Sequence, residues 1–226
     1  MISTKLKNLK IATILPYKED YSFIKASAVS LWVAEFFRYS KFKNNNTIYG
    51  STKSNDFLTK NYINIELESL DKRFVSTTSE YSKKLLINLE KNNFDLIEIH
   101  NRPSYVHHLI TKNIKSKLVL IFHNNPLALG GSKSIRERND LIEKCEKLIF
   151  VSGWVKEKFF EGLDRKNHTK CEIIYPSINP IKKFPTKKKI ISFVGKLNRS
   201  KGFHLFGSVI VKILNKYKNW KGIIVG

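Results

Sequence analysis

Short apolar runs alternate with longer amphipathic segments along nearly the whole sequence, and this order limits the folds that the chain can adopt. The amphipathic segments repeat apolar residues at intervals of about three and four, which is typical of helices that are buried on one side. Strands that alternate with helices of about 10 to 15 residues favour a mainly parallel sheet. The predicted fold class is therefore α/β, with a doubly wound parallel sheet. The predicted strands are residues 10–17, 44–50, 62–67, 94–100, 117–125 and 147–152, and the predicted helices are residues 22–42, 79–93, 104–114, 134–145 and 153–163.

The alternation is interrupted by residues 171–189. This segment holds three prolines and a cluster of lysines, a composition typical of a connection rather than of a packed element. A strand, a helix and a strand follow it, and these elements alone cannot bury both faces of a parallel sheet. We therefore expect the chain to be the front part of a longer protein, or a fragment of one. The predicted parts are an N-terminal domain at residues 1–175, a linker at 176–189 and the incomplete start of a second domain at 190–226.

Side-chain patterns also predict local details of three helices. Ser79 precedes one helical pattern and is a candidate N-cap, and Ser152 is the corresponding candidate before residues 153–163. The last helix, within residues 203–217, is expected to bury one apolar face. The residues predicted for that face are Leu205, Val209, Ile213 and Leu214.

The chain is strongly basic, and its charge is unevenly distributed. Its 41 Lys and Arg residues against 19 Asp and Glu residues give a formal net charge of +22. No acidic residue follows Glu172, whereas twelve Lys and Arg residues do. A general lysine-rich bias explains a solvated cationic surface, and the acid-free part also suits the phosphates of a nucleotide, a nucleic acid or anionic lipids. Composition alone leaves both interpretations open.

Two features favour a cytoplasmic protein. The basic start of the chain precedes an apolar run that is too short for a signal peptide, and no run approaches the roughly 20 residues that cross a bilayer. Cys145 falls in a helical pattern and Cys171 in a strand-like one, which favours reduced buried thiols over a disulfide framework or a metal site. We therefore predict a cytoplasmic protein and no metal site.

The stretch ISFVGKLNRSKGF places three cations between two glycines at the start of a predicted helix. Lys196, Arg199 and Lys201 lie between Gly195 and Gly202. The dipole and the unpaired N–H groups of a helix N-terminus favour an anion at such a position. Neither GxxxxGK[ST] nor GxGxxG is present, which excludes the two common phosphate-binding fingerprints. Taken alone, the stretch is explained equally well as a solvated basic loop.

The segment FVGKLNRSKGFHLF resembles the pattern VGRL...KG...LL that opens the C-terminal domain of family 4 glycosyltransferases. That family has the GT-B architecture of two Rossmann-like domains. In it, the Arg after the first Gly and the Lys before the second contact the diphosphate of a nucleotide-sugar donor. The matching positions are Lys196 and Lys201, and Arg199 between them is assigned to the same role. Lysine at 196 departs from the family pattern, because it keeps the charge but lacks the planar fork of arginine.

Other segments resemble the same family in the same order, so the resemblance spans nearly the whole chain. KIATILPYKEDYSFIKASAVSLWV resembles the first strand, the substrate loop and the first helix, although IKASA replaces the usual glycine-rich loop. Ala26 and Ser27 are small enough there for close approach of the backbone to a substrate. FDLIEIHNRP resembles the strand that ends in a His near the cleft, which is His100. KLVLIFHNNP resembles the next strand, whose terminal His123 faces the substrates. CEKLIFVSGWVKEKF and CEIIYPSINP resemble the segments that precede the link between the domains.

His123 is the strongest candidate for a catalytic residue. Together with Asn124 it provides a polar cluster suited to sugar hydroxyls, and a neutral imidazole can donate or accept a hydrogen bond there. His100 is interpreted either as a substrate-binding residue or as a hydrogen-bonded residue at a strand end. Arg102 either contacts an acceptor carboxylate or phosphate, or is a surface charge. His107 and His108 are expected to be surface or packing residues.

The resemblance implies a GT-B fold in which a Rossmann-like doubly wound parallel sheet precedes the start of a second Rossmann-like domain. It implies a hexosyltransferase-like enzyme that retains anomeric configuration, takes a nucleotide-sugar donor, and needs no cofactor and no obligatory metal. The expected acceptor is a glycan or lipid-linked molecule of cell-envelope polysaccharide or lipopolysaccharide biosynthesis. A cationic surface would suit peripheral contact with the anionic inner face of the membrane.

Further expectations concern the missing half of the donor site and the alternatives. The family's paired glutamates, which hold the donor's ribose and sugar, would lie beyond Gly226, so the chain alone is expected to be inactive. A basic nucleic-acid-binding protein and a non-catalytic remnant are the alternatives. We expect no nucleic-acid partner, because the aromatic residues fall mainly at core spacing and no recognition motif is present.

Overall fold

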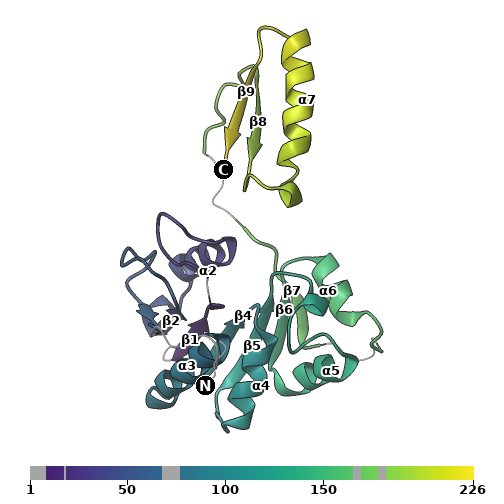
Figure 1. Ribbon diagram of the computed structural model, residues 1–226. Helices are drawn as coiled ribbons and strands as arrows, with labels where there is room; N and C mark the ends of the chain where they lie inside the picture. The colour runs from purple at the N-terminus through teal and green to yellow at the C-terminus, as the bar shows by residue number, and fades with distance from the viewer. Residues whose placement is uncertain (1–8, 18, 68–76, 165–168, 178–181) are drawn as a thin grey trace. The chain divides into compact units, whose positions relative to one another are not determined.

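The computed structural model describes residues 9–17, 19–67, 77–164, 169–177 and 182–226. The chain forms two compact units, residues 1–178 and residues 179–226 (Figure 1). The division between them falls within the segment that the sequence predicts to be a linker, residues 176–189.

The first unit is built on a parallel sheet of seven strands in the order β3-β2-β1-β4-β5-β6-β7. All six neighbouring pairs are parallel, so the predicted α/β class is confirmed. The strands β4 and β5 lie near the middle and are flanked on both sides. The strands are β1 (Ile11–Ile14), β2 (Asn46–Gly50), β3 (Tyr62–Asn64), β4 (Leu96–His100), β5 (Lys117–Phe122), β6 (Lys147–Phe150) and β7 (Cys171–Ile173).

Helices pack on both faces of this sheet. Two clusters of buried side chains separate the faces: one joins α2 to the sheet, and the other joins α3, α4, α5 and α6 to it. This follows from the strand order, because the connections from β1 through β3 move one way along the sheet and those from β3 through β7 move the other way. The helices are α2 (Ala28–Tyr39), α3 (Thr77–Lys91), α4 (Pro103–Thr111), α5 (Ile135–Lys144) and α6 (Gly153–Phe160), with short 3₁₀ turns η1 (Lys43–Asn45) and η2 (Pro126–Ala128).

Two predictions about this unit need correction, and one is confirmed. The helix α3 already begins at Thr77, so Ser79 lies in its first turn and not at the cap. The first residues of the predicted connection 171–189 form the edge strand β7, which pairs with β6. Cys145 and Cys171 are free and buried, as predicted, and burial raises the pKa of the Cys145 thiol to about 12.

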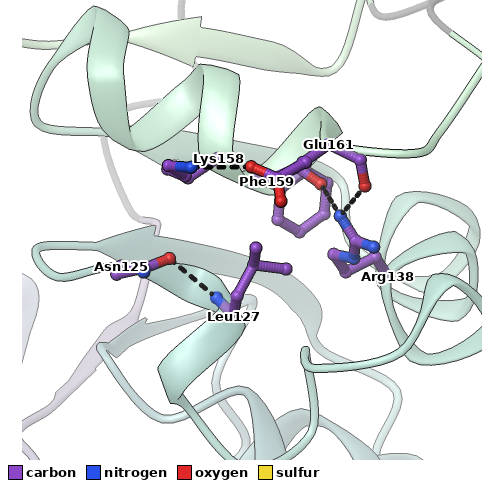
Figure 2. A network of polar contacts seen from close by, with 6 residues as sticks. All are labelled: Asn125, Leu127, Arg138, Lys158, Phe159 and Glu161. Atoms are coloured by element: carbon purple, nitrogen blue, oxygen red, sulfur yellow. Dashed lines mark hydrogen bonds and ion pairs between the residues drawn. The ribbon is translucent and has the colours of Figure 1, made fainter.

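A buried arginine ties α5 to the end of α6 (Figure 2). The Arg138 guanidinium donates to the backbone carbonyls of Phe159 at 2.5 Å and Glu161 at 2.7 Å. These carbonyls lie at the C-terminal end of α6, where helix carbonyls lack partners within the helix and a cation is favoured.

The same view shows the Asn125 side chain accepting the N–H of Leu127 at 3.0 Å, which caps η2. The turn η2, which follows β5, is therefore fixed at its start by the side chain of Asn125.

The second unit contains two parallel strands, β8 (Ile190–Val194) and β9 (Lys221–Val225), and one helix, α7 (Phe203–Lys216). The prediction for the buried face of α7 was wrong at two positions, since Leu205 and Val209 are 61% and 52% exposed. Ile210 is buried instead, because Gly222 on β9 leaves room for it: a Cβ at Gly222 would lie 3.0 Å from Ile210 Cγ1. The strands β8 and β9 together cover only one apolar stripe of α7, so Leu205 and Val209 on the neighbouring stripe stay exposed.

None of the helices in the described ranges combines the length and the apolar character that crossing a membrane requires.

Candidate functional site

Polar side chains gather at the carboxyl ends of three neighbouring strands. β1, β4 and β5 are adjacent and parallel, so the segments that follow them leave the sheet at the same edge. In open α/β sheets this edge is where ligands bind. The sequence-predicted residues found after these strands are Ala26 and Ser27 after β1, His100 and Arg102 at the end of β4, and His123 and Asn124 after β5.

A hydrogen-bonded chain links a carboxylate and two imidazoles at this edge. Glu98 Oε1 lies 2.6 Å from His100 Nε2, and His100 Nδ1 lies 2.9 Å from His123 Nε2. Glu98 and His100 are two residues apart on β4 and so point to the same face of the sheet. The register of β4 with β5 pairs His100 with Ile121, which brings His123 next to it. The structure thus brings together the two histidines that the sequence singles out.

Both imidazoles pack against Trp32 of α2. The Trp32 ring meets His100 and His123 edge-on, with ring centroids 5.3 and 5.2 Å apart. The His100 side chain is fully buried, and His123 is partly buried. Burial and the neighbouring His100 lower the pKa of His123 from its ordinary value of 6.5 to about 3. His123 is therefore a neutral imidazole at ordinary pH.

Asn101, which was not among the residues predicted from the sequence, holds the end of β5 in place. Its side-chain oxygen accepts the backbone N–H groups of His123 and Asn124, both at 3.2 Å. Its own backbone has φ of 54°, a left-handed conformation that asparagine tolerates better than most residues. The available signal was its position between His100 and Arg102, directly after a predicted strand. Asn101 is buried, so it acts on the site through these backbone contacts rather than by direct contact with a substrate.

The other predicted residues of this edge have local partners. Ser27 caps α2, since its hydroxyl accepts the N–H of Ser30 at 3.1 Å, and Ala26 precedes it. Arg102 donates to the carbonyl of Asn101 at 2.9 Å, and Asn124 is exposed.

Two predictions away from this edge can be compared directly with the structure. Ser152 caps α6 as expected, with its hydroxyl accepting the N–H of Val155 at 3.2 Å. His107 packs within α4 and contacts the carbonyl oxygen of Gly131 at 3.1 Å, and His108 is exposed.

In the second unit, the cations Lys196, Arg199 and Lys201 lie on the loop between β8 and α7. All three are exposed, and among the described residues none forms an ion pair. Asn198 shapes the loop, since its side-chain oxygen accepts the N–H of Lys201 at 3.1 Å at the start of η3 (Arg199–Lys201).

Two glycines in left-handed conformations frame that loop, Gly195 with φ of 148° and Gly202 with φ of 77°. Gly202 is also the N-cap of α7 and offers no side chain to its first N–H groups. The loop therefore combines free cations with free backbone donors.

The part of the chain that the structure describes holds no group of three or more His, Cys, Asp and Glu side chains placed to bind a metal ion.

Comparison with curated proteins finds distant similarity. No family model matches the sequence. The chain is 23% identical over 165 residues to the putative glycosyltransferase YtcC of Bacillus subtilis strain 168, which is 65% of this chain and 40% of YtcC. It is 22% identical over 166 residues to spore coat protein SA of the same organism, which is 65% of this chain and 43% of that protein. The chain spans about two fifths of the length of these relatives.

Solved structures resemble the fold more fully. Anabaena HepE in complex with UDP-glucose has a TM-score of 0.63 at 13% identity, covering 96% of this chain and 69% of HepE. Sucrose-phosphate synthase from Thermosynechococcus elongatus has a TM-score of 0.63 at 13% identity, covering 96% of this chain and 62% of the synthase. The predicted GT-B fold type is thereby confirmed.

Proposed function

We propose that this chain is part of a glycosyltransferase that moves a sugar from a nucleotide-sugar donor to a hydroxyl acceptor. The observation that carries the proposal is the hydrogen-bonded Glu98–His100–His123 chain, centred on a buried imidazole, at the carboxyl ends of β4 and β5 in a GT-B fold. The name of YtcC and the UDP-glucose held by HepE support the reaction class and the donor class.

The edge of the first unit suits a substrate with hydroxyl groups. His123 stays neutral because protonation would place a charge in a buried site beside another imidazole. A neutral imidazole can accept a hydrogen bond from a sugar hydroxyl, and Asn124 offers an exposed amide beside it. We assign His123 to the reacting hydroxyl or sugar, and Ala26, Ser27, His100, Arg102 and Asn124 to the surroundings of the substrate.

The loop of the second unit suits the diphosphate of the donor. Sugar transfer leaves a nucleoside diphosphate, whose negative charge grows as the bond to the sugar breaks. Fixed cations and backbone N–H groups at a helix N-terminus stabilise such a charge. Lys196, Arg199 and Lys201 are assigned to this role, which requires no divalent ion. Membership of glycosyltransferase family 4 and retention of anomeric configuration are part of the same proposal.

The basic charge of the chain supports a proposal for its location, and the family resemblance supports one for its acceptor. No acidic residue occurs after Glu172, so this part of the chain would be attracted to anionic lipid headgroups. We propose a cell-envelope glycan or a lipid-linked glycan as the acceptor, and a peripheral position at the inner face of the membrane.

Titration of UDP into the 226-residue chain, followed by amide NMR signals, tests the donor assignment. We expect UDP at millimolar concentrations to shift the signals of residues 195–203, while uridine, which lacks phosphate, leaves them unchanged. Lys201→Ala should weaken these shifts several-fold, because one charge-assisted contact is lost. Lys212→Ala, which removes an exposed lysine from the C-terminal half of α7, is the matched control and should bind UDP as the unaltered chain does.

Absence of UDP-induced shifts in the unaltered chain, or equal shifts in Lys201→Ala, would overturn the donor assignment. Salt-dependent retention on DNA without any response to UDP would instead favour a nucleic-acid-binding protein.

A further inference from the structure

We propose that Glu98 is a positioning residue of this site: acting through His100, it fixes His123 in the tautomer whose unprotonated Nδ1 accepts a hydrogen bond from a substrate hydroxyl. The role of the substrate hydroxyl rests on the proposed function, whereas the tautomer of His123 is a property of the chain itself. Glu98 was not among the site residues predicted from the sequence.

Glu98 is an acidic residue within a strand whose other side chains are apolar or imidazole. A carboxylate in such a place costs free energy unless it is hydrogen-bonded. Among the described residues, the only hydrogen-bond partner of Glu98 is His100, at 2.6 Å. The side chain of His100 is fully buried, and that of Glu98 is 26% exposed. The pair is therefore oriented by a single short contact on the face of the sheet that α2 covers.

Water has access to the carboxylate from a cavity of about 210 Å³ between α2 and the sheet. Glu98 lines this cavity together with Thr13, Asn46 and apolar side chains that include Trp32 and Phe36. Water there can solvate the carboxylate oxygen that does not face His100. Glu98 can thus remain a hydrogen-bond acceptor for the buried imidazole.

The protons along the chain follow from what each group can donate. An ionised carboxylate only accepts, so Nε2 of His100 carries a hydrogen. In a neutral imidazole the other nitrogen is then an acceptor, and His100 Nδ1 lies 2.9 Å from His123 Nε2. His123 must therefore donate through Nε2, which leaves its Nδ1 unprotonated.

The unprotonated nitrogen of His123 is free to meet a substrate. Among the described residues, His123 Nδ1 has no hydrogen-bond partner. Trp32 packs against both imidazoles, and Asn101 accepts the backbone N–H of His123, so the ring has a fixed position. A partner that orients an imidazole through its second nitrogen is a common means of selecting a tautomer. The geometry assigns this role to Glu98 by way of His100.

The tautomer can be observed directly in the 226-residue chain labelled with ¹⁵N-histidine. Long-range ¹H–¹⁵N correlation spectra distinguish protonated from unprotonated ring nitrogens. We expect His123 to show a protonated Nε2 and an unprotonated Nδ1. A protonated Nδ1 on His123 would overturn the proposal, because His123 would then offer no acceptor nitrogen to a substrate hydroxyl.

Substitution of Glu98 tests whether it selects this tautomer. Glu98→Leu removes the acceptor at similar volume, so His100 can reverse its tautomer and the His123 Nδ1 signal should move towards an averaged position. Glu98→Gln keeps an amide oxygen that can accept from His100, and should restore a larger share of the original form. Leu96→Val changes the same face of β4 two residues earlier and should leave the His123 signals unchanged.

The outcomes separate this inference from the proposed function. Unchanged His123 nitrogen signals in Glu98→Leu, with UDP still bound by the loop of the second unit, would refute the role of Glu98 alone. A chain in which His123 has the expected tautomer but UDP causes no shifts would refute the proposed donor and leave the role of Glu98 as a finding about the fold.

Discussion

The His123 ring is surrounded by groups that oppose a positive charge on it. Trp32 excludes water from one side, and His100 occupies Nε2 at 2.9 Å. The cost of protonation appears as a pKa of about 3 in the folded chain, against 6.5 for an ordinary histidine. A residue that must accept a hydrogen bond benefits from this environment, and the folded protein becomes less stable in acid because of it.

The pH dependence of stability should therefore decrease when His123 is removed. Between about pH 6.5 and pH 3 the unfolded chain binds a proton at His123 and the folded chain does not, so protonation favours unfolding as the pH falls. The loss approaches at most about 1.4 kcal/mol per pH unit within this window. We expect His123→Asn to lose less unfolding free energy than the unaltered chain between pH 7 and pH 5, measured by urea denaturation.

The exposed His108 offers the control for this measurement, since it lies on α4 away from the sheet edge. His108→Asn should keep the pH dependence of the unaltered chain. An identical acid response in His123→Asn and the unaltered chain would show that His123 is protonated equally in the folded and unfolded states.

Substitutions of Asn101 can separate the stability that comes from its backbone conformation from the stability that comes from its side-chain hydrogen bonds. Asn101→Gly keeps the left-handed φ of 54° but loses both hydrogen bonds to the chain after β5, and we expect it to lower the unfolding free energy by about 1–2 kcal/mol. Asn101→Ala should cost roughly 1 kcal/mol more, because alanine does not favour positive φ. Denaturation of both variants in urea gives the two values.

Asn113 supplies a matched comparison, because it has the same φ of 54° but is exposed, and its side chain has no hydrogen-bond partner in the part of the chain that the structure describes. Asn113→Gly should change stability by less than about 1 kcal/mol. A loss in Asn101→Gly no larger than that in Asn113→Gly would contradict the supporting role of Asn101.

At the scale of elements, the helices that follow β5 and β6 depend on one buried guanidinium. Arg138 on α5 satisfies two carbonyls at the end of α6, and the turn η2 after His123 packs against α6. Burial lowers the pKa of Arg138, but a guanidinium remains charged at any ordinary pH. The position of the loop after β5 is thus coupled to α5 through α6.

Removal of this guanidinium should loosen α6. Arg138→Met keeps much of the apolar stem but leaves the carbonyls of Phe159 and Glu161 without a buried donor, and we expect a loss of about 2–3 kcal/mol in unfolding free energy. Arg136→Met on the exposed side of α5 is the control and should change stability by about 0.5 kcal/mol or less. Urea denaturation of the two variants measures the difference, and equal values would argue against the link between α5 and α6.

At the scale of the whole molecule, the sequence predicted the helices and strands, which depend on local periodicity. It did not predict contacts that depend on how separate elements are placed next to one another. The alternation of strands and helices was visible because buried faces repeat along each element. The pattern at Cys171 was strand-like, but β7 has only three residues, too few to show a period, and the prolines that follow it made residues 171–189 resemble a connection. The contact between Glu98 and His100 was not predicted, because it depends on the direction in which the side chains of β4 point. The contact between His100 and His123 depends on the register between β4 and β5, which the sequence does not show.

The same distinction explains the error in α7. Its sequence carries apolar residues around much of its surface, and the period alone does not say which stripe is covered. Gly222 on β9 makes the choice, because only a residue without a side chain leaves room for Ile210. His100 and His123 were predicted from their position at strand ends. Asn101 has a similar position, but it was missed because its role depends on a left-handed backbone and on contacts with the chain after β5, which the sequence does not show.

The two units should differ widely in the protection of their backbone amides. Strands β4 and β5 are paired on both sides and covered on both faces. Within the described ranges β8 and β9 pair only with each other, and every residue of β9 is exposed. Opening β8 and β9 exposes little apolar surface, so its free energy should lie far below that of opening β4 and β5. We expect hydrogen exchange of the 226-residue chain to be faster in β8 and β9 by orders of magnitude. The strand β3 serves as an internal comparison, since it lies at the end of the described strand order but belongs to the larger sheet. Equal protection in β8 and β4 would mean that the second unit gains stability from contacts beyond its own one helix and two strands.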